Sequence, residues 1–117
     1  MRTFVFPVVA LLVVACGSYP KPEARIASSE GAIRGAEEAG APKVPQAALH
    51  LKLAQEERAK GIALIREGEF ERADYMFQRA EADAELANAL SREATAKGEL
   101  QQAQEQLDSV KKKAVEK

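Results

Sequence analysis

Residues 59–86, AKGIALIREGEFERADYMFQRAEADAEL, decide the fold of this chain. Apolar and small residues recur at helical spacing on both sides of Gly68-Glu69, and a glycine at this place is typical of a helix end. The stretch therefore predicts two antiparallel helices joined by a short turn. Small side chains let the helices approach closely, and aromatic rings fill the space between them. The residues that we expect to pack this hairpin are Gly61, Leu64, Gly68, Phe70, Ala73, Phe77 and Ala80.

The chain on either side of this hairpin also reads as helical, and no segment alternates as a strand does. Gly40-Ala41-Pro42 ends a first helix, and Pro45 suits the first turn of a second. We expect an all-α fold, either a small antiparallel helical hairpin or a three-helix arrangement with a long C-terminal helix. The expected helices span about residues 23–39, 45–67 and 69–113. The buried face of the second is expected along Ala48, Leu51, Ala54 or Gln55, Ala59, Ile62 and Ile65.

The hairpin resembles one helical pair of a tetratricopeptide repeat, with glycine, turn and small residues at similar places. The chain departs from that pattern where Glu57 and Lys60 replace Trp and Leu, and where Glu85 replaces a proline. The sequence shows no second copy of the motif, whereas stable arrays need about three. We therefore interpret the segment as a plain αα-hairpin, with a true repeat protein as the alternative.

The last part of the third expected helix carries apolar residues at spacings of three and four, which is typical of a coiled-coil seam. The row covers about two heptads, fewer than the three to four that identify a coiled coil. Three partners stay open for it: a second copy, a helix of another protein, or the two preceding helices. The expected seam consists of Leu100, Ala103, Leu107 and Val110.

The first sixteen residues indicate export. Arg2 precedes an uncharged run from Phe4 to Ala15, which is too short to span a bilayer and is typical of a signal peptide. The run ends in Val13-Val14-Ala15-Cys16, which resembles the bacterial lipobox. The resemblance implies cleavage before Cys16, lipid attachment to its thiol and acylation of the new N-terminus. An ordinary signal peptide is the alternative.

The lipobox divides the chain into a lipoprotein signal peptide (residues 1–15), a lipidated tether (16–22) and an alanine-rich helical domain (23–117). Several acyl chains hold a protein on a membrane where a single chain holds it only weakly. Gly17 follows the cysteine in place of the aspartate that retains lipoproteins at the inner membrane of enteric bacteria. We therefore expect a palmitate-bearing anchor in the outer membrane, with the protein on the periplasmic face.

The composition argues against several classes of function. The 17 basic and 18 acidic residues nearly cancel to a formal net charge of −1, so we expect no nucleic-acid surface. One Cys and one His make neither an internal disulfide nor a multi-histidine metal site, and no nucleophile elbow or phosphate loop occurs. We expect no metal, no cofactor and no enzymatic activity. We interpret His50 as an ordinary surface or partly packed residue, and Glu81, Asp83 and Glu85 as a solvated acidic face.

A wider resemblance covers most of the chain after the tether. Its features are Ala39-Gly40-Ala41-Pro42, residues 48–54, the glycine–acid–aromatic turn at 68–70 and the run AEADAELA at 80–87. In these the chain resembles the bacterial envelope family catalogued as domain of unknown function 4398. The resemblance implies a small alanine-rich lipoprotein, or a region of the kind that precedes an OmpA-like peptidoglycan-binding domain. From the lipobox, the hairpin and the absence of catalytic motifs, we expect a non-catalytic helical interaction module of the cell envelope. An OmpA-like envelope protein or a second copy is then the expected partner.

An alternative function rests on the C-terminus. The chain ends in Lys117 after a helix with heptads, and in this it resembles the major outer-membrane lipoprotein, whose terminal lysine is joined to peptidoglycan. That resemblance implies a structural tether, which would link the outer membrane to peptidoglycan through the C-terminal helix and Lys117.

Overall fold

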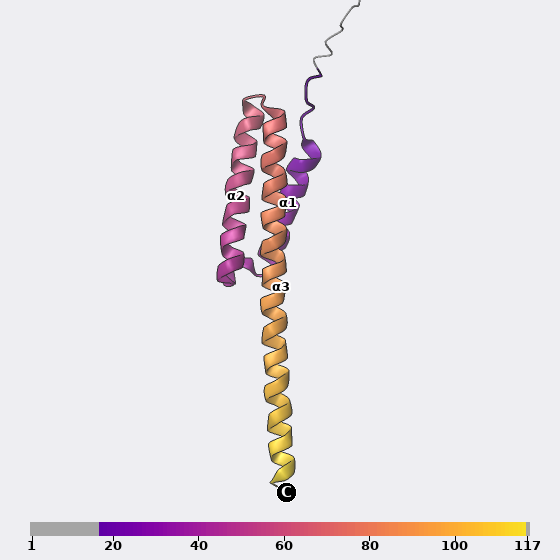
Figure 1. The fold of residues 1–117 in the computed structure, drawn as a ribbon, viewed down its shortest axis with the longest axis vertical. Coiled ribbons are helices and arrows are strands. Elements are labelled where there is room, and N and C mark those ends of the chain that lie inside the picture. The colour runs from indigo at the N-terminus through magenta and orange to yellow at the C-terminus, as the bar shows by residue number, and fades with distance from the viewer. Residues whose placement is uncertain (1–16, 117) are drawn as a thin grey trace, which may run out of the picture.

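The computed structural model describes residues 17–116 and consists there of three α-helices and a short 3₁₀ turn. Helix α1 spans Glu23–Glu38, α2 spans Pro45–Arg66 and α3 spans Phe70–Val115, with the 3₁₀ turn at Ala41–Lys43 between the first two (Figure 1). The described residues hold no strand, which confirms the expected all-α fold with a long C-terminal helix. The expected signal peptide, Cys16 and Lys117 lie outside the described residues.

Two glycines with positive φ end the first two helices. Gly68 has a φ of 77°, a conformation that side chains with a Cβ rarely adopt. Its N–H donates to the Ile65 carbonyl at 3.1 Å, and the N–H of Glu69 donates to the Leu64 carbonyl at 3.0 Å. This pair of bonds is the Schellman motif, which satisfies the last carbonyls of α2 and turns the chain into α3. Gly40, which follows α1, adopts the same left-handed conformation, with a φ of 89°.

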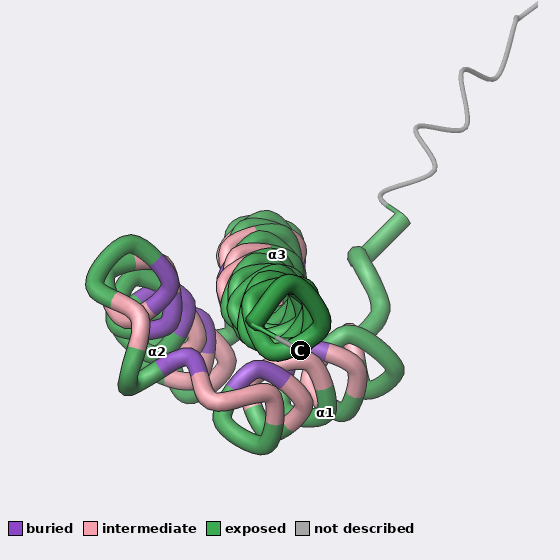
Figure 2. Tube along the Cα trace, turned by 90° about the horizontal axis from the view of Figure 1, so that it is seen from below, coloured by how far each residue is buried: buried purple, intermediate pink, exposed green. Residues whose placement is uncertain are grey.

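The three helices form a bundle around the first half of α3. Helix α2 runs antiparallel to α3, and α1 lies along α3 on another side (Figures 1 and 2). The core is thin because alanine supplies most of it, so the helix backbones approach one another closely. One large ring, that of Phe77, is fully buried. The buried hydrophobic residues are Ala36, Ala41, Ala47, Leu51, Ala54, Ala73, Phe77, Ala80, Ala84 and Ala87.

The second half of α3 leaves this bundle and continues alone. Ser91 is the last buried residue of the helix, and residues 95–116 are all exposed. At about 1.5 Å per residue, this free extension measures on the order of 30 Å. The helix runs unbroken through Gly98, and its C-terminal end lies far from the α2–α3 turn (Figure 1).

The buried face of α2 differs from the expected one. Ala59, expected inside, is exposed, and Glu57, which was not expected inside, is buried. The face passes from Leu51 and Ala54 through Glu57 to Gly61, at helical spacings of three and four. An acidic side chain can occupy this stripe because an arginine of α3, Arg79, binds its carboxylate.

Candidate functional site at the tether junction and the exposed helical surfaces

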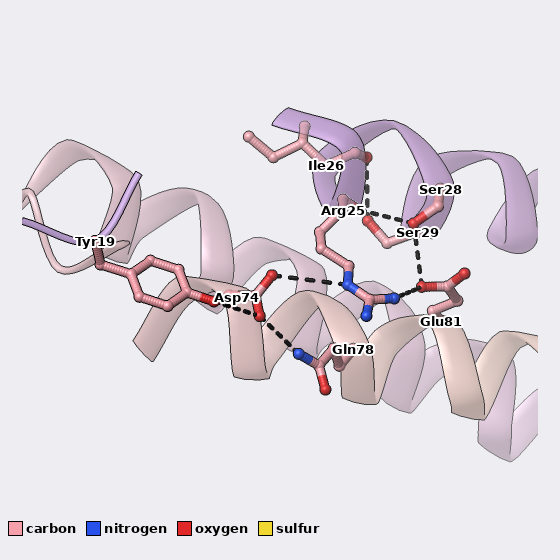
Figure 3. Close-up of polar contacts among 8 residues, drawn as sticks. All are labelled: Tyr19, Arg25, Ile26, Ser28, Ser29, Asp74, Gln78 and Glu81. Carbon is pink, nitrogen blue, oxygen red and sulfur yellow. Dashed lines mark hydrogen bonds and ion pairs between the residues drawn. The ribbon is translucent and has the colours of Figure 1, made fainter. Parts of the chain in front are cut away.

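The tether is bonded to the bundle by a tyrosine. The Tyr19 hydroxyl donates to Asp74 Oδ2 at 3.0 Å, although 55 positions separate the two residues in the sequence (Figure 3). Asp74 lies one turn inside α3 and is 9% exposed, and Gln78 Nε2 donates to the same oxygen at 2.6 Å. We call this cluster the tether junction. It places the tether beside the turn between α2 and α3.

Helix α1 joins the tether junction through Arg25. Its Nε lies 3.7 Å from Asp74 Oδ1, and its Nη1 donates to Glu81 Oε2 at 3.1 Å (Figure 3). Ser28 Oγ donates to the same Glu81 oxygen at 3.1 Å. One arginine therefore links two carboxylates of α3, which fixes the start of α1 on the long helix. Glu81 is thus part of an inter-helix contact. The expectation of a freely solvated acidic face was wrong for Glu81 and for Asp83, which contacts His50 of α2, whereas Glu85 is exposed.

The tether junction changes the ionisation of the Tyr19 phenol. Its hydrogen bond to Asp74, together with that carboxylate's negative charge, raises the pKa of the Tyr19 phenol above its ordinary value of 10.0. A tyrosine that loses its proton can no longer donate this bond and meets a like charge instead. The hydrogen bond between Tyr19 and Asp74 therefore requires the protonated, neutral form of the phenol.

A second polar cluster lies between α2 and α3. Arg79 Nη2 lies 2.7 Å from Glu57 Oε1, while Glu57 Oε2 is buried without a hydrogen-bond partner. Burial is the main cause that raises the pKa of the Glu57 carboxyl, Arg79 opposes it, and the neighbouring Asp83 adds to it. His50 Nδ1 lies 2.7 Å from Asp83 Oδ1, so this histidine is held by an acidic partner 33 positions away.

The expected hairpin residues lie together near the α2–α3 turn. A Cβ built on Gly61 would lie 2.8 Å from Cε1 of Phe77, so glycine is what lets the ring occupy this place. Gly61, Ala73, Phe77 and Ala80 are buried, Leu64 and Phe70 are half-buried, and Gly68 forms the turn.

An open groove lies on the outer side of this hairpin, and we call it the hairpin groove. Its volume is about 420 Å³, and its lining is mostly apolar with two cationic side chains. Tyr75, whose side chain contributes to it, is 57% exposed, which is high for a large aromatic residue. The hairpin groove is lined by Lys60, Ala63, Leu64, Arg72, Tyr75 and Met76.

The expected coiled-coil seam lies entirely on the free extension of α3. Leu100 is 60% exposed, Leu107 54% and Val110 62%, and Ala103 is exposed beside them. Of the three partners left open, the two preceding helices do not cover it, because they end alongside the first half of α3 (Figure 1). We call Leu100, Ala103, Leu107 and Val110 the α3 seam.

Comparison with known proteins places the chain in a family. A family model described as "Domain of unknown function (DUF4398)" matches residues 24–103. The chain belongs to this family. The DUF4398 match includes α1 from its second residue, all of α2 and the part of α3 that they cover, and thus Arg25, Asp74 and Glu81 of the tether junction. No curated protein and no solved structure matches the chain.

Within residues 17–116, no three His, Cys, Asp or Glu side chains converge as metal ligands would. No helix in the described part of the chain is long and apolar enough to cross a bilayer.

Proposed function

We propose that this protein is an outer-membrane lipoprotein, anchored through Cys16 on the periplasmic face, that acts as a non-catalytic helical interaction module of the cell envelope. The anchor is inferred from the lipobox-like residues 13–16, which follow a run typical of a signal peptide. The tether junction supports this proposal, because it holds the tether against one end of the bundle and so sets the direction in which the bundle would lie relative to an anchor.

The observation that carries the proposal is that the tether and the free extension of α3 lie at opposite ends of the molecule. The tether lies beside the α2–α3 turn, and the free extension of α3 continues beyond the other end of the bundle (Figure 1). The hairpin groove is lined by residues on both sides of that turn, and the α3 seam lies on the free extension. A protein held at the turn would therefore extend the α3 seam away from the membrane. Exposed apolar surface of this kind marks sites of interaction, and here it lies at both ends of the molecule.

The anchor is tested by comparing wild type with Cys16→Ser after labelling with palmitate and fractionation of the envelope. We expect label and outer-membrane recovery for wild type and for the control Ser18→Ala, and neither for Cys16→Ser. If Cys16→Ser still fractionated with the outer membrane, the anchoring proposal would be lost.

The interaction role is tested by placing a photo-reactive amino acid at Leu107 in intact cells. We expect a discrete cross-linked product from this position and none from Ser109, which lies on another face of the same exposed helix. Equal or absent products at both positions would contradict an interacting seam. An OmpA-like protein in the product would identify the partner that the family resemblance implies.

A second candidate function is a structural link to peptidoglycan through Lys117. The direction of α3 favours it, because the helix carries the C-terminal residues away from the tether junction. Deletion of Lys117 should then abolish protein that stays covalently bound to purified sacculi. Absence of wall-bound protein in the parent strain would end this candidate.

A further inference from the structure

The first described residues, which follow Cys16 closely, lie beside the α2–α3 turn. Ser18 and Tyr19 line an open pocket together with residues 68–72, which form the turn and the start of α3. Cys16 is two residues from Ser18, and two residues of extended chain span at most ~7 Å. A lipid on Cys16 would therefore enter the bilayer close to the turn.

The hairpin groove begins near the turn and so lies close to the same membrane surface. Leu64 and Arg72 are each four positions from Gly68, or ~6 Å along their helices at about 1.5 Å per residue. Lys60 and Met76, the lining residues farthest from the turn, are each eight positions away, or ~12 Å. The polar headgroup layer of a bilayer is about 5–7 Å deep on each side. The near part of the groove therefore lies at the level of the headgroups around such an anchor.

The lining of the hairpin groove matches the two parts of a phospholipid. Its wall is mostly apolar, and Tyr75 adds a ring with a polar tip, a residue type that is enriched where membranes meet water. Lys60 and Arg72 are the charged residues of the lining, and both are exposed. Cationic side chains of this kind bind phosphate oxygens through charge-assisted hydrogen bonds.

The aromatic residues of the described chain are gathered at this end of the molecule. Within residues 17–116 they are Tyr19 in the tether and Phe70, Tyr75 and Phe77 near the start of α3. Tyr19 is 43% exposed and Tyr75 57%, although each carries a large apolar ring. Tyrosines whose rings are exposed beside an anchor are what we expect of a protein that rests on a lipid surface.

The charges around the turn favour a zwitterionic lipid over an anionic one. Residues 60–76 carry three basic and four acidic side chains, and one of the acids, Asp74, is bound in the tether junction. The other charges cancel, so this end has no excess of basic residues that would draw it to a negative surface. A zwitterionic lipid offers a phosphate to Lys60 and Arg72 and an ammonium group to the glutamates, of which Glu69 lies 3.7 Å from Arg72.

We propose that the hairpin groove binds a zwitterionic phospholipid of the leaflet that holds the anchor. The lipid phosphate lies between Lys60 and Arg72, and its glycerol region lies against the apolar wall beside Tyr75. This inference rests on the proposed lipid anchor at Cys16. The bundle then stands on the membrane by its α2–α3 turn, and the free extension of α3 points away from the lipid.

The proposal is tested with a tryptophan probe, since the chain has no tryptophan of its own. Chains that begin at Cys16 are coupled through this single thiol to a maleimide lipid in phosphatidylcholine vesicles, and circular dichroism checks the fold of each variant. We expect lipids brominated near the glycerol to quench Tyr75→Trp strongly. Leu49→Trp should be quenched little, because Leu49 is equally exposed, at 57%, but lies nineteen positions from Gly68.

A second probe in the groove, Met76→Trp, should be quenched as Tyr75→Trp is. Similar quenching at Leu49→Trp and at the groove probes would show that the bundle has no preferred contact with the lipid, and would overturn the proposal. Absence of quenching at both groove probes would overturn it as well.

Charge reversal distinguishes a bound phospholipid from mere closeness to the membrane. Lys60→Glu combined with Arg72→Glu should remove most of the quenching of Tyr75→Trp, because the lipid phosphate is then repelled. The matched pair Lys43→Glu with Lys52→Glu changes two exposed lysines far from the turn and should leave the quenching unchanged. Equal effects of the two pairs would contradict a phosphate site in the groove. Quenching that occurs only after phosphatidylglycerol is added would contradict the zwitterionic ligand.

The same probe reports a different occupant of the groove. Without vesicles, a blue shift of the Tyr75→Trp emission that grows with protein concentration would show that a second copy fills the groove, and would overturn the proposal. Because the lipid is attached chemically, these results do not depend on lipidation in cells. The fractionation experiment with Cys16→Ser decides the anchor separately, so failure of the groove site and failure of the proposed function are distinguishable.

Discussion

Gly61→Ala should destabilise the bundle although alanine is the better helix former. A Cβ at residue 61 would lie 2.8, 2.9 and 3.0 Å from three carbons of the Phe77 ring. This ring is fully buried, so it cannot move aside into solvent. Overpacking of this kind costs about 1–3 kcal/mol, whereas the gain in helix propensity is at most about 1 kcal/mol. We therefore expect a net loss of about 1 kcal/mol in the free energy of unfolding.

The assay is urea unfolding followed by circular dichroism at 222 nm, with Gly31→Ala as the matched control. No atom lies within 4 Å of a Cβ built on Gly31, which sits in the interior of α1. This variant should gain about 0.5–1 kcal/mol from helix propensity alone. In addition, Phe77→Leu should make the cost of Gly61→Ala smaller, since the two residues share one space. A Gly61→Ala protein as stable as Gly31→Ala would refute the close approach of α2 and α3.

Three further predictions concern the junction, the buried carboxyl and the seam. Tyr19→Phe should release the tether at neutral pH, measured as faster proteolysis at residues 17–22. The wild-type protein should be cleaved as fast as this variant only above the raised pKa of Tyr19, on the alkaline side of 10.0. The folded chain binds the Glu57 proton more tightly than the unfolded chain, so lowering the pH from 7 to about 4.5 should stabilise wild type relative to Glu57→Gln in urea titrations. Leu107→Gln should leave the thermal midpoint of the bundle unchanged, because Leu107 contacts no other helix of the chain.

The helices could be predicted from the sequence because their boundaries depend on local chemistry. Gly40 and Gly68 adopt the positive φ that helix ends favour, and Pro45 occupies the first turn of α2. The long α3 also follows from local sequence, since no proline interrupts it. These signals lie within a few residues of the feature they determine, so a single sequence carries them.

The polar contacts between helices could not be predicted in this way. Glu57 breaks the apolar stripe of α2, and its partner Arg79 lies on another helix. Tyr19 looks like part of a flexible tether until α3 brings Asp74 beside it. Nothing in the spacing of either pair indicates contact. A clue was present for Glu57 alone, because it lies three residues after Ala54 and four before Gly61 on the buried face.

The mass of the intact protein purified from envelopes tests the central proposal most directly. Lipid anchoring predicts a chain that begins at Cys16 and carries the added mass of a diacylglycerol and an amide-linked acyl group, which a thioether-specific fragment would assign to the cysteine. An unmodified Cys16, or a chain that retains residues 1–15 without added lipid mass, would contradict the account of this protein as a membrane-anchored module.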